Sequence, residues 1–185
     1  MTEKQLIKAC LRKDGKAEKQ LFLRFAPKVL TLCRRYAANN QDAEDYLQEC
    51  FLHLFDRLRQ YDDTRGAFGG WLYRLCTNRI LQLIRAQNSK VTMIFPEQLP
   101  EQGISNQELA GIPQEQILHA IQQLPEAYRL VLNLYVFDGW QHEDIAAELG
   151  ISPSSSRSRL TRARALLKKI LKKSDDLTYE KRLAR

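Results

Sequence analysis

The sequence of 185 residues contains no long uninterrupted run of apolar residues. A helix that crosses a membrane needs about 18 or more such residues, so membrane insertion is not expected. The first residues, MTEKQLIKACLRKDGK, return to charged side chains too soon to form the apolar core of a secretory signal. We therefore expect a cytoplasmic protein.

Glycine and proline are also scarce, with 8 and 6 residues, and this excludes collagen-like and Gly/Pro-rich low-complexity chains. The hydrophobic share of 44% is typical of a globular protein rather than a disordered one. The length fits one ordinary domain or two small ones.

The four cysteines, Cys10, Cys33, Cys50 and Cys76, show no C-x-x-C spacing, which excludes the common zinc and dithiol motifs. Three of them fall on apolar helical stripes, and Cys10 lies among leucines and an isoleucine, so we expect core cysteines in a reducing compartment. No metal site and no cofactor are expected.

Common enzyme motifs are missing as well, since the chain has no G-x-x-x-x-G-K-[ST], no H-E-x-x-H and no G-x-S-x-G. The three histidines, His53, His119 and His142, are far apart and are more typical of surface or capping positions. An enzyme is therefore not expected.

Positive charge is in excess, with 29 Lys and Arg against 22 Asp and Glu. Residues 1–90 carry 17 basic and 10 acidic side chains, residues 91–112 carry three acidic ones only, and residues 113–185 carry 12 and 9. The segment Ile151–Lys173 contains eight basic residues and no acidic one. Arginine forks suit phosphates and guanine edges, so this segment predicts nucleic-acid binding.

Apolar residues recur at helical spacing throughout, and no alternation typical of strands is present, which predicts an all-α protein. In the first half we expect helices over 16–38, 42–58 and 67–87, with Pro27 as a kink or break. In the second half we expect four helices, over 114–123, from Pro125 to Phe137, over 142–149 and over 153–173.

The helical pattern is lost between Ser89 and Pro113, a segment with three prolines and two glycines. A stretch of this length without secondary structure is uncommon inside one compact domain. We therefore expect two domains, over 1–90 and 113–173, joined by a flexible linker over 91–112 and followed by a tail over 174–185.

The segment IAAELGI, Ile145–Ile151, predicts a helix-turn-helix. Ala146 is small where the helices cross, and Gly150 can adopt the positive φ of the turn. Ser152 and Pro153 suit the start of the second helix. Ser156 is expected inside the hairpin, where its hydroxyl needs a partner such as a carbonyl one turn back. The N-terminal half of this helix would face base edges with Ser154, Ser155, Arg157, Ser158, Thr161 and Arg162.

Two surfaces in the first half suggest further partners. The predicted helix over 42–58 exposes an acidic face, which is either a solvated surface or a contact for a basic or polar protein. The segment GAFGGWLYRLCTNRILQLIR combines aromatic and basic side chains, as binding of single-stranded DNA requires. Within it Trp71 is more typical of a core residue, and Tyr73 with Arg74 and Asn78 is the better candidate surface.

These segments, in this order, resemble the extracytoplasmic-function (ECF) group of bacterial RNA polymerase sigma factors. DAEDYLQECFLHLFDRL (42–58) resembles the helix of that family that binds core polymerase, and GAFGGWLYRLCTNRILQLIR (66–85) resembles its promoter-melting segment. Residues 124–169 resemble its −35-binding domain. The resemblance covers roughly residues 4–173.

The resemblance implies three sets of contact residues. The clamp of the largest subunit of core RNA polymerase would be bound by Asp42, Asp45, Gln48 and Glu49. Bases of the melted −10 element would be held by Arg65 to Phe68, Trp71, Tyr73, Arg74 and Asn78. The −35 duplex would be bound by Ser154, Ser155, Arg157, Ser158, Thr161 and Arg162, with Arg159 and Arg164 on phosphates.

Two positions depart from the pattern of the family, because Gln141 replaces a capping Ser and Ser156 replaces an apolar residue. The resemblance implies a non-catalytic sigma factor that selects promoters, with an anti-sigma factor as a further partner. The alternative is a stand-alone regulator that binds duplex DNA through the helix-turn-helix and needs no polymerase.

Overall fold

A computed structural model describes residues 1–88 and 111–183, with side chains described as far as residue 173. The chain divides into two compact units, Met1–Val91 and Thr92–Arg185. Every regular element in the described ranges is a helix, which confirms the predicted all-α class. Most of the expected linker lies outside the described residues.

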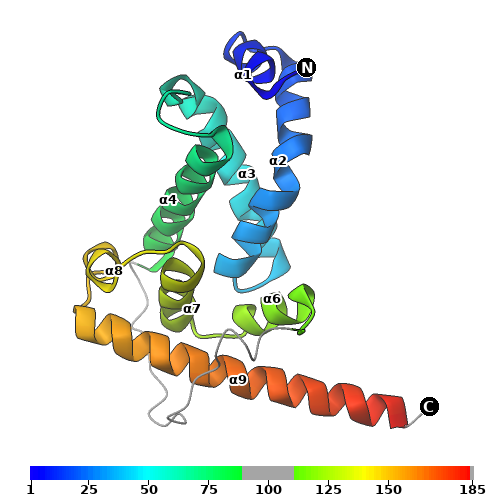
Figure 1. Cartoon of the computed structure of the whole chain (residues 1–185), viewed down its shortest axis with the longest axis vertical. Helices are drawn as coiled ribbons and strands as arrows, with labels where there is room; N and C mark the ends of the chain where they lie inside the picture. Colours follow the sequence, from blue (N-terminus) through cyan, green and yellow to red (C-terminus); the bar gives the residue numbers. More distant parts are fainter. Residues whose placement is uncertain (89–110, 184–185) are drawn as a thin grey trace. The chain divides into compact units, whose positions relative to one another are not determined.

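Residues 1–88 form four α-helices and one short 3-10 helix (Figure 1). These are α1 (Glu3–Leu11), α2 (Gly15–Tyr36), α3 (Asn40–Arg57), η1 (Leu58–Gln60) and α4 (Phe68–Asn88). Helix α3 packs against both α2 and α4, and the three lie side by side (Figure 1). Each contributes one buried stripe at helical spacing, formed by Leu21, Phe25, Val29 and Leu32, by Tyr46, Cys50 and Leu54, and by Leu72, Cys76, Ile80 and Ile84.

Helix α1 was not predicted, although its start carries a local signal. Thr2 Oγ1 accepts a hydrogen bond from the Gln5 N–H at 3.3 Å, and Gln5 Oε1 accepts one from the Thr2 N–H at 2.9 Å. This capping box satisfies two backbone donors that the helix itself leaves unpaired. Of the kink or break predicted at Pro27, the break is wrong, because α2 continues through this exposed residue from Gly15 to Tyr36.

The expected burial of the cysteines is confirmed. Cys33, Cys50 and Cys76 come from α2, α3 and α4 and have no exposed surface, and Cys10 is buried as well. The Cys50 thiol donates to the Cys76 carbonyl with a sulfur–oxygen distance of 3.7 Å. Hydrogen bonding to Cys50 and burial raise the pKa of the Cys33 and Cys76 thiols, so both stay protonated near neutral pH.

Between residues 111 and 183 the chain forms α6 (Gln114–Gln122), α7 (Glu126–Leu132), the π-helical turn η2 (Asn133–Phe137), α8 (His142–Leu149) and α9 (Pro153–Leu183). Helix α9 packs against α6, α7 and α8. Pro125 is the N-cap of α7 rather than its first residue. Helix α9 extends ten residues past the predicted end at Lys173, because no Gly or Pro follows to stop it.

Helices α8 and α9 form the predicted helix-turn-helix. Gly150 ends α8 at φ +64°, a left-handed conformation that favours glycine. The Ile151 N–H donates to the Ala146 carbonyl at 3.0 Å and closes the turn. Ser152 Oγ accepts from the Ser155 N–H at 3.1 Å, which confirms Ser152 as the cap of α9, whereas Gln141 makes no side-chain cap for α8.

Ser156 is fully buried, as predicted, but its predicted partner is wrong. Its hydroxyl hydrogen-bonds to His142 Nδ1 of α8 at 2.9 Å, whereas a carbonyl of its own helix was expected. The His142 ring stacks on Tyr135 of η2, with centroids 4.5 Å apart and an 18° angle between the planes. A histidine expected at the surface therefore connects three elements of the C-terminal unit.

Acidification is expected to destabilise the C-terminal unit through His142. Burial lowers the pKa of His142 below its ordinary value of 6.5, and the charge of Arg157 acts in the same direction. The unfolded chain therefore takes up a proton before the folded unit does, so the free energy of unfolding should fall as the pH drops below 6.5. Urea unfolding followed by circular dichroism from about pH 7.5 to about pH 5 measures the slope of the free energy of unfolding against pH.

The variant His142→Gln should flatten the slope, because glutamine does not titrate in this range. The matched control is His119→Gln, which changes an exposed histidine on α6 of the same unit and should leave the slope as in the parent protein. An unchanged slope in His142→Gln would contradict the assignment.

Candidate nucleic-acid interface

The first half of α9 carries a hollowed polar surface. A depression of about 450 Å³ is lined by Ser154, Ser155, Ser158, Arg159 and Arg162. Ser154, Ser158 and Arg162 follow one another at intervals of four residues, so they lie on one face of the helix. This face combines hydroxyl groups with guanidinium donors, the groups that hydrogen-bond to base edges and phosphates.

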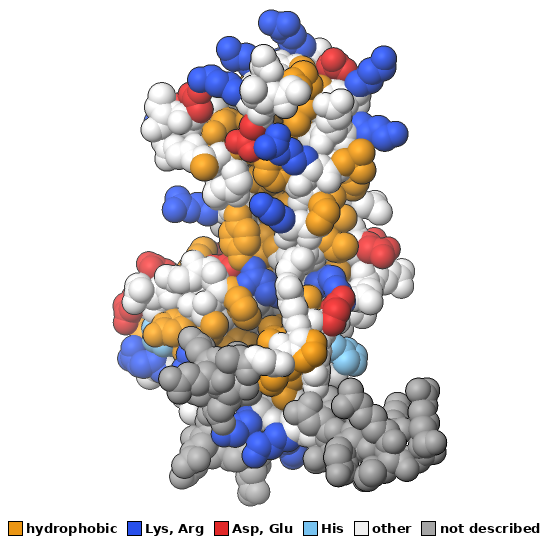
Figure 2. Space-filling view, turned by 45° about the vertical axis from the view of Figure 1, so that its right-hand side comes forward, with side chains coloured by type: hydrophobic (Ala, Val, Ile, Leu, Met, Phe, Trp, Pro, Cys, Tyr) orange, Lys and Arg blue, Asp and Glu red, His pale blue; other side chains and the backbone are white. Residues whose placement is uncertain are grey.

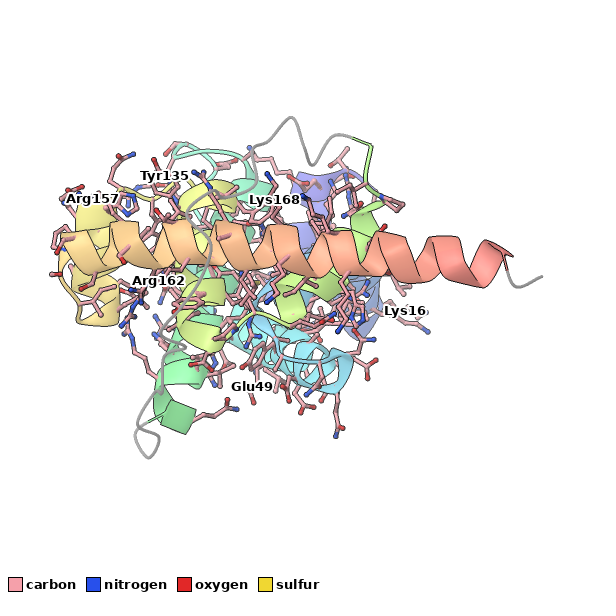
Figure 3. The ribbon with its side chains drawn as sticks, turned by 90° about the horizontal axis from the view of Figure 1, so that it is seen from below. Lys16, Glu49, Tyr135, Arg157, Arg162 and Lys168 are labelled. Atoms are coloured by element: carbon pink, nitrogen blue, oxygen red, sulfur yellow. The ribbon has the colours of Figure 1, made fainter. Side chains whose placement is uncertain are left out.

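The remaining predicted residues of α9 lie beside this depression. Arg157 pairs with Glu143 of α8 at 3.6 Å, with both side chains more than half exposed. The Thr161 hydroxyl donates to the Arg157 carbonyl at 3.2 Å, and Arg164 is half-buried. Figure 3 shows Arg157 and Arg162 on the first part of α9 and Lys168 farther along the helix. The eight predicted residues therefore share the first part of one helix, and five of them line the depression.

In the N-terminal unit, a second hollow of about 370 Å³ lies where the turn after η1 meets the start of α4. Arg65, Trp71 and Arg74 line it, together with Tyr61 and Gly70. The Tyr61 hydroxyl donates to the Gly66 carbonyl at 3.1 Å, which fixes the turn. The Tyr61 and Trp71 ring centroids lie 5.4 Å apart. We call this site the Trp71 hollow.

Phe68 is buried, contrary to the prediction from the sequence. It was predicted to contact DNA, but its side chain has no exposed surface. Its ring meets Phe25 and Tyr61 edge to face, with centroid distances of 5.1 Å in both pairs. Phe68 therefore packs beneath the aromatic cluster and is unavailable to a ligand. Trp71, which the sequence favoured as a core residue, is only partly buried.

Tyr73 lies on another side of α4. The Arg35 guanidinium donates to the Tyr73 hydroxyl and also lies over its ring, 5.8 Å from the centroid. Tyr73 lines a separate hollow of about 250 Å³ with Phe25 and Lys28 of α2. Asn78 is exposed and lines neither the Trp71 hollow nor the hollow beside Tyr73. The predicted −10 set is therefore not a single site.

The four residues predicted on the acidic face of α3 differ in exposure and in their contacts within the unit. Asp42 accepts a hydrogen bond from the Asn39 side chain at 2.9 Å at the start of the helix. Glu49 pairs with Arg79 of α4 at 2.5 Å, a partner that the sequence did not indicate. Asp45 and Gln48 are exposed. Figure 3 labels Glu49 on α3. Of the four predicted residues, Asp45 and Gln48 present the most accessible surface.

Basic side chains are numerous at one end of this unit. In Figure 2, Lys and Arg gather around the end that carries α1, where Lys8, Arg12, Lys13 and Lys16 are exposed. Their charge favours the approach of a polyanion. No group of three metal-ligating side chains suited to an ion occurs within the part of the chain that the structure describes. None of the described helices is long and apolar enough to cross a membrane.

Comparisons with known proteins identify the two units. Residues 21–90 match the family Sigma-70 region 2, and residues 114–167 match Sigma-70, region 4. Among solved structures, the sigma factor RpoE in complex with the anti-sigma factor NepR from Bartonella quintana is similar, with a TM-score of 0.48 and 21% identity over 83% of this chain and 96% of that one.

Two curated relatives align over most of the chain. The ECF RNA polymerase sigma factor SigE of Mycolicibacterium smegmatis is 33% identical over 87% of this chain. The aligned part spans 64% of the length of that relative. The ECF RNA polymerase sigma-E factor of Escherichia coli is 33% identical over 89% of this chain and 91% of its own length. This identity over nearly the whole of both chains, with both regions present in order, shows that the chain belongs to the ECF group of RNA polymerase sigma factors.

Proposed function

We propose that this protein binds core RNA polymerase and directs it to promoters by reading a −35 duplex and trapping melted −10 bases. The observation that carries the proposal is the presence on one chain of two different hollows whose linings suit nucleic acid. One is the serine- and arginine-lined depression on α9, and the other is the aromatic Trp71 hollow at the start of α4.

The α9 surface fits the major groove of a duplex. A recognition helix places the residues of its first turns against base edges, and Ser154, Ser158 and Arg162 occupy these turns. Arg159 and Arg164 are half-buried and suit phosphate contacts at the edge of the groove. Lys168, Lys169, Lys172 and Lys173 extend the positive charge along the helix and add affinity that does not depend on sequence.

The Trp71 hollow fits an unpaired base. Extruding a base from a duplex costs a few kcal/mol. Stacking on an aromatic side chain returns about 1–3 kcal/mol per base, so capture can offset melting without hydrolysis of a nucleotide. Arg65 and Arg74 line the same hollow and are exposed, so they can contact the phosphates beside the captured base.

The exposed acidic face of α3 is proposed as the polymerase contact, with Asp45 and Gln48 at its centre. Because both DNA-binding units belong to one chain, binding of one element raises the local concentration of the other unit at its own element. Weak separate affinities then suffice once polymerase carries both.

No step of this proposal requires catalysis by the chain. Membership of the group also suggests a regulatory anti-sigma factor that covers one or both units, and a cytoplasmic site of action beside the polymerase. A stand-alone regulator is not favoured, because the region 2 match adds a polymerase-binding domain that such a regulator does not need.

The function is tested by run-off transcription over a promoter library, with core RNA polymerase alone and with the chain added. Transcripts that start at a defined set of promoters only when the chain is present would support the proposal. Operator binding and full regulation without polymerase would contradict it.

Replacement of Arg162 by alanine is expected to weaken binding to the selected −35 duplex. Loss of a guanidinium that reads a base edge removes about 1–3 kcal/mol of discrimination. Affinity for the duplex and for a variant with a changed −35 base is measured by fluorescence anisotropy at fixed salt. The matched control Lys172→Ala removes one exposed positive charge farther along α9. It should weaken binding to both duplexes equally. If Arg162→Ala still distinguished the two duplexes as well as the parent protein does, Arg162 would not be a residue that reads a −35 base.

Charge reversal at Asp45 is expected to reduce affinity for core polymerase by about tenfold or more, because a basic partner would then meet a like charge. Binding of Asp45→Lys to purified core enzyme is compared with that of Glu44→Lys. Glu44 is an exposed acidic neighbour that helical geometry places about 100° away around α3. Thermal unfolding should be the same in both variants. Equal polymerase binding by both would contradict the assignment of this face.

A further inference from the structure

An ion pair between Arg157 of α9 and Glu143 of α8 lies at the edge of the proposed duplex-binding face. Arg157 Nη1 and Glu143 Oε1 are 3.6 Å apart, and both side chains are more than half exposed. Arg157 lies near the start of α9 (Figure 3) and leaves the helix about 100° around from its neighbour Ser158. A long side chain at this edge can turn either to the bases in the groove or to the phosphates beside it.

A buried hydrogen bond determines where this ion pair lies. Glu143 and Arg157 directly follow His142 and Ser156, whose side chains are bonded at 2.9 Å between α8 and α9. Ser156 has no exposed surface. Each exposed residue is therefore the chain neighbour of one partner in a buried bond, so the packing of the two helices keeps the carboxylate beside the guanidinium. A group held by rigid elements positions its partner more precisely than a group on a loop does.

A carboxylate at this place is unexpected. The segment Ile151–Lys173 contains eight basic residues and no acidic one, and Glu143 brings a negative charge to its edge from another helix. An ion pair this exposed contributes little to stability. The dipole of α8 favours an acidic residue in its first turn, but Asp144 lies in that turn as well. Neither stability nor the dipole explains why Glu143 is beside Arg157.

We propose that Glu143 determines specificity in the −35 contact by directing the Arg157 guanidinium to a base edge and away from phosphates. The inference rests on the proposed function, because it requires α9 to bind duplex DNA. Glu143 is a positioning residue, since it acts through Arg157 and does not itself contact DNA.

The geometry of the pair allows both effects. The carboxylate balances part of the charge of the guanidinium, which reduces an attraction to phosphates that does not depend on sequence. At 3.6 Å the pair is longer than a hydrogen bond, so the N–H donors of Arg157 are not used up by Glu143. These donors form the planar fork that fits the O6 and N7 atoms of guanine.

The test uses holoenzyme assembled from core polymerase and this chain, on a promoter fragment chosen by the run-off assay. Each base pair of the −35 element is changed in turn, and the ratio of the affinities for the selected and the changed fragment gives the discrimination at that position. Arg157→Ala identifies the base pair that Arg157 reads, because discrimination falls there. Glu143→Gln should lower discrimination at the same base pair by about threefold or more, as expected for two coupled residues.

The salt dependence of binding gives a second readout, which a merely structural role would not change. In Glu143→Gln the guanidinium is free to take up a phosphate, so affinity for the changed fragments should rise. The plot of log affinity against log salt should steepen by about 0.9, the slope of one phosphate contact.

The matched control is Asp144→Asn, which removes an exposed carboxylate from the same turn of α8. It changes the net charge and the dipole interaction by the same amount, so thermal unfolding should be equal in the two variants. Discrimination at every base pair and the salt slope should stay as in the parent protein. In the background of Arg157→Ala, adding Glu143→Gln should change neither quantity.

Discrimination that is unchanged in Glu143→Gln, or that falls equally in Asp144→Asn, would overturn the inference. An unchanged profile in Arg157→Ala would overturn it too, because Arg157 would then read no base. So would an effect of Glu143→Gln that persists without Arg157, since the carboxylate would then contact DNA itself, for example the amino group of cytosine. Each of these results leaves promoter-dependent transcription by the parent protein intact. A parent chain that supports no such transcription would instead contradict the proposed function.

Discussion

The packing of α3 between α2 and α4 determines which surfaces the N-terminal unit can offer. Each of these helices has one apolar stripe, and the three stripes meet around Cys33, Cys50 and Cys76. Once a stripe is buried, helical geometry fixes the direction of every other side chain on that helix. The acidic face of α3 and the aromatic residues of α4 are therefore presented by one rigid core rather than by separate loops. A captured base and a bound polymerase would share that core.

Helix α9 likewise has a buried side and an exposed side in the C-terminal unit. It is buried along one side by α6, α7 and α8, and the opposite side of its first turns stays exposed, as the proposed duplex contact requires. Small buried residues, Ser156, Ala163 and Ala165, allow the other helices to pack closely. The bond between Ser156 and His142 replaces the apolar contact expected there and connects α9 to α8. The exposed face with Ser158 and Arg162 depends on this packing for its direction.

The helices and their buried faces followed from periodicity, because a 3.6-residue repeat is local information. Contacts between residues far apart in the sequence could not be predicted from this repeat. These contacts place residues that were predicted to share one site in different parts of the unit. The ring of Phe68 looked like a ligand contact in the sequence but meets two other rings in the core. Tyr73 lies beside Arg35, 38 residues away, and this pairing has no signal in either segment. Helix α1 is short, and its local signals, the capping box at Thr2 and the buried Leu6, Ile7 and Cys10 at helical spacing, cover only about two turns.

The bond between Glu49 and Arg79 connects the proposed polymerase face of α3 with the helix that carries the proposed base-binding surface. Glu49 lies on the acidic side of α3, but its carboxylate is 2.5 Å from a guanidinium of α4, so much of its charge is balanced within the unit. A polymerase contact through Glu49 would have to replace this partner, whereas Asp45 and Gln48 need no rearrangement. The same pair connects α3 to the helix that carries Trp71 and Tyr73. Because the two helices are already joined, the proposed binding of polymerase to α3 would position the proposed base-binding surface of α4 without the entropy cost of ordering it.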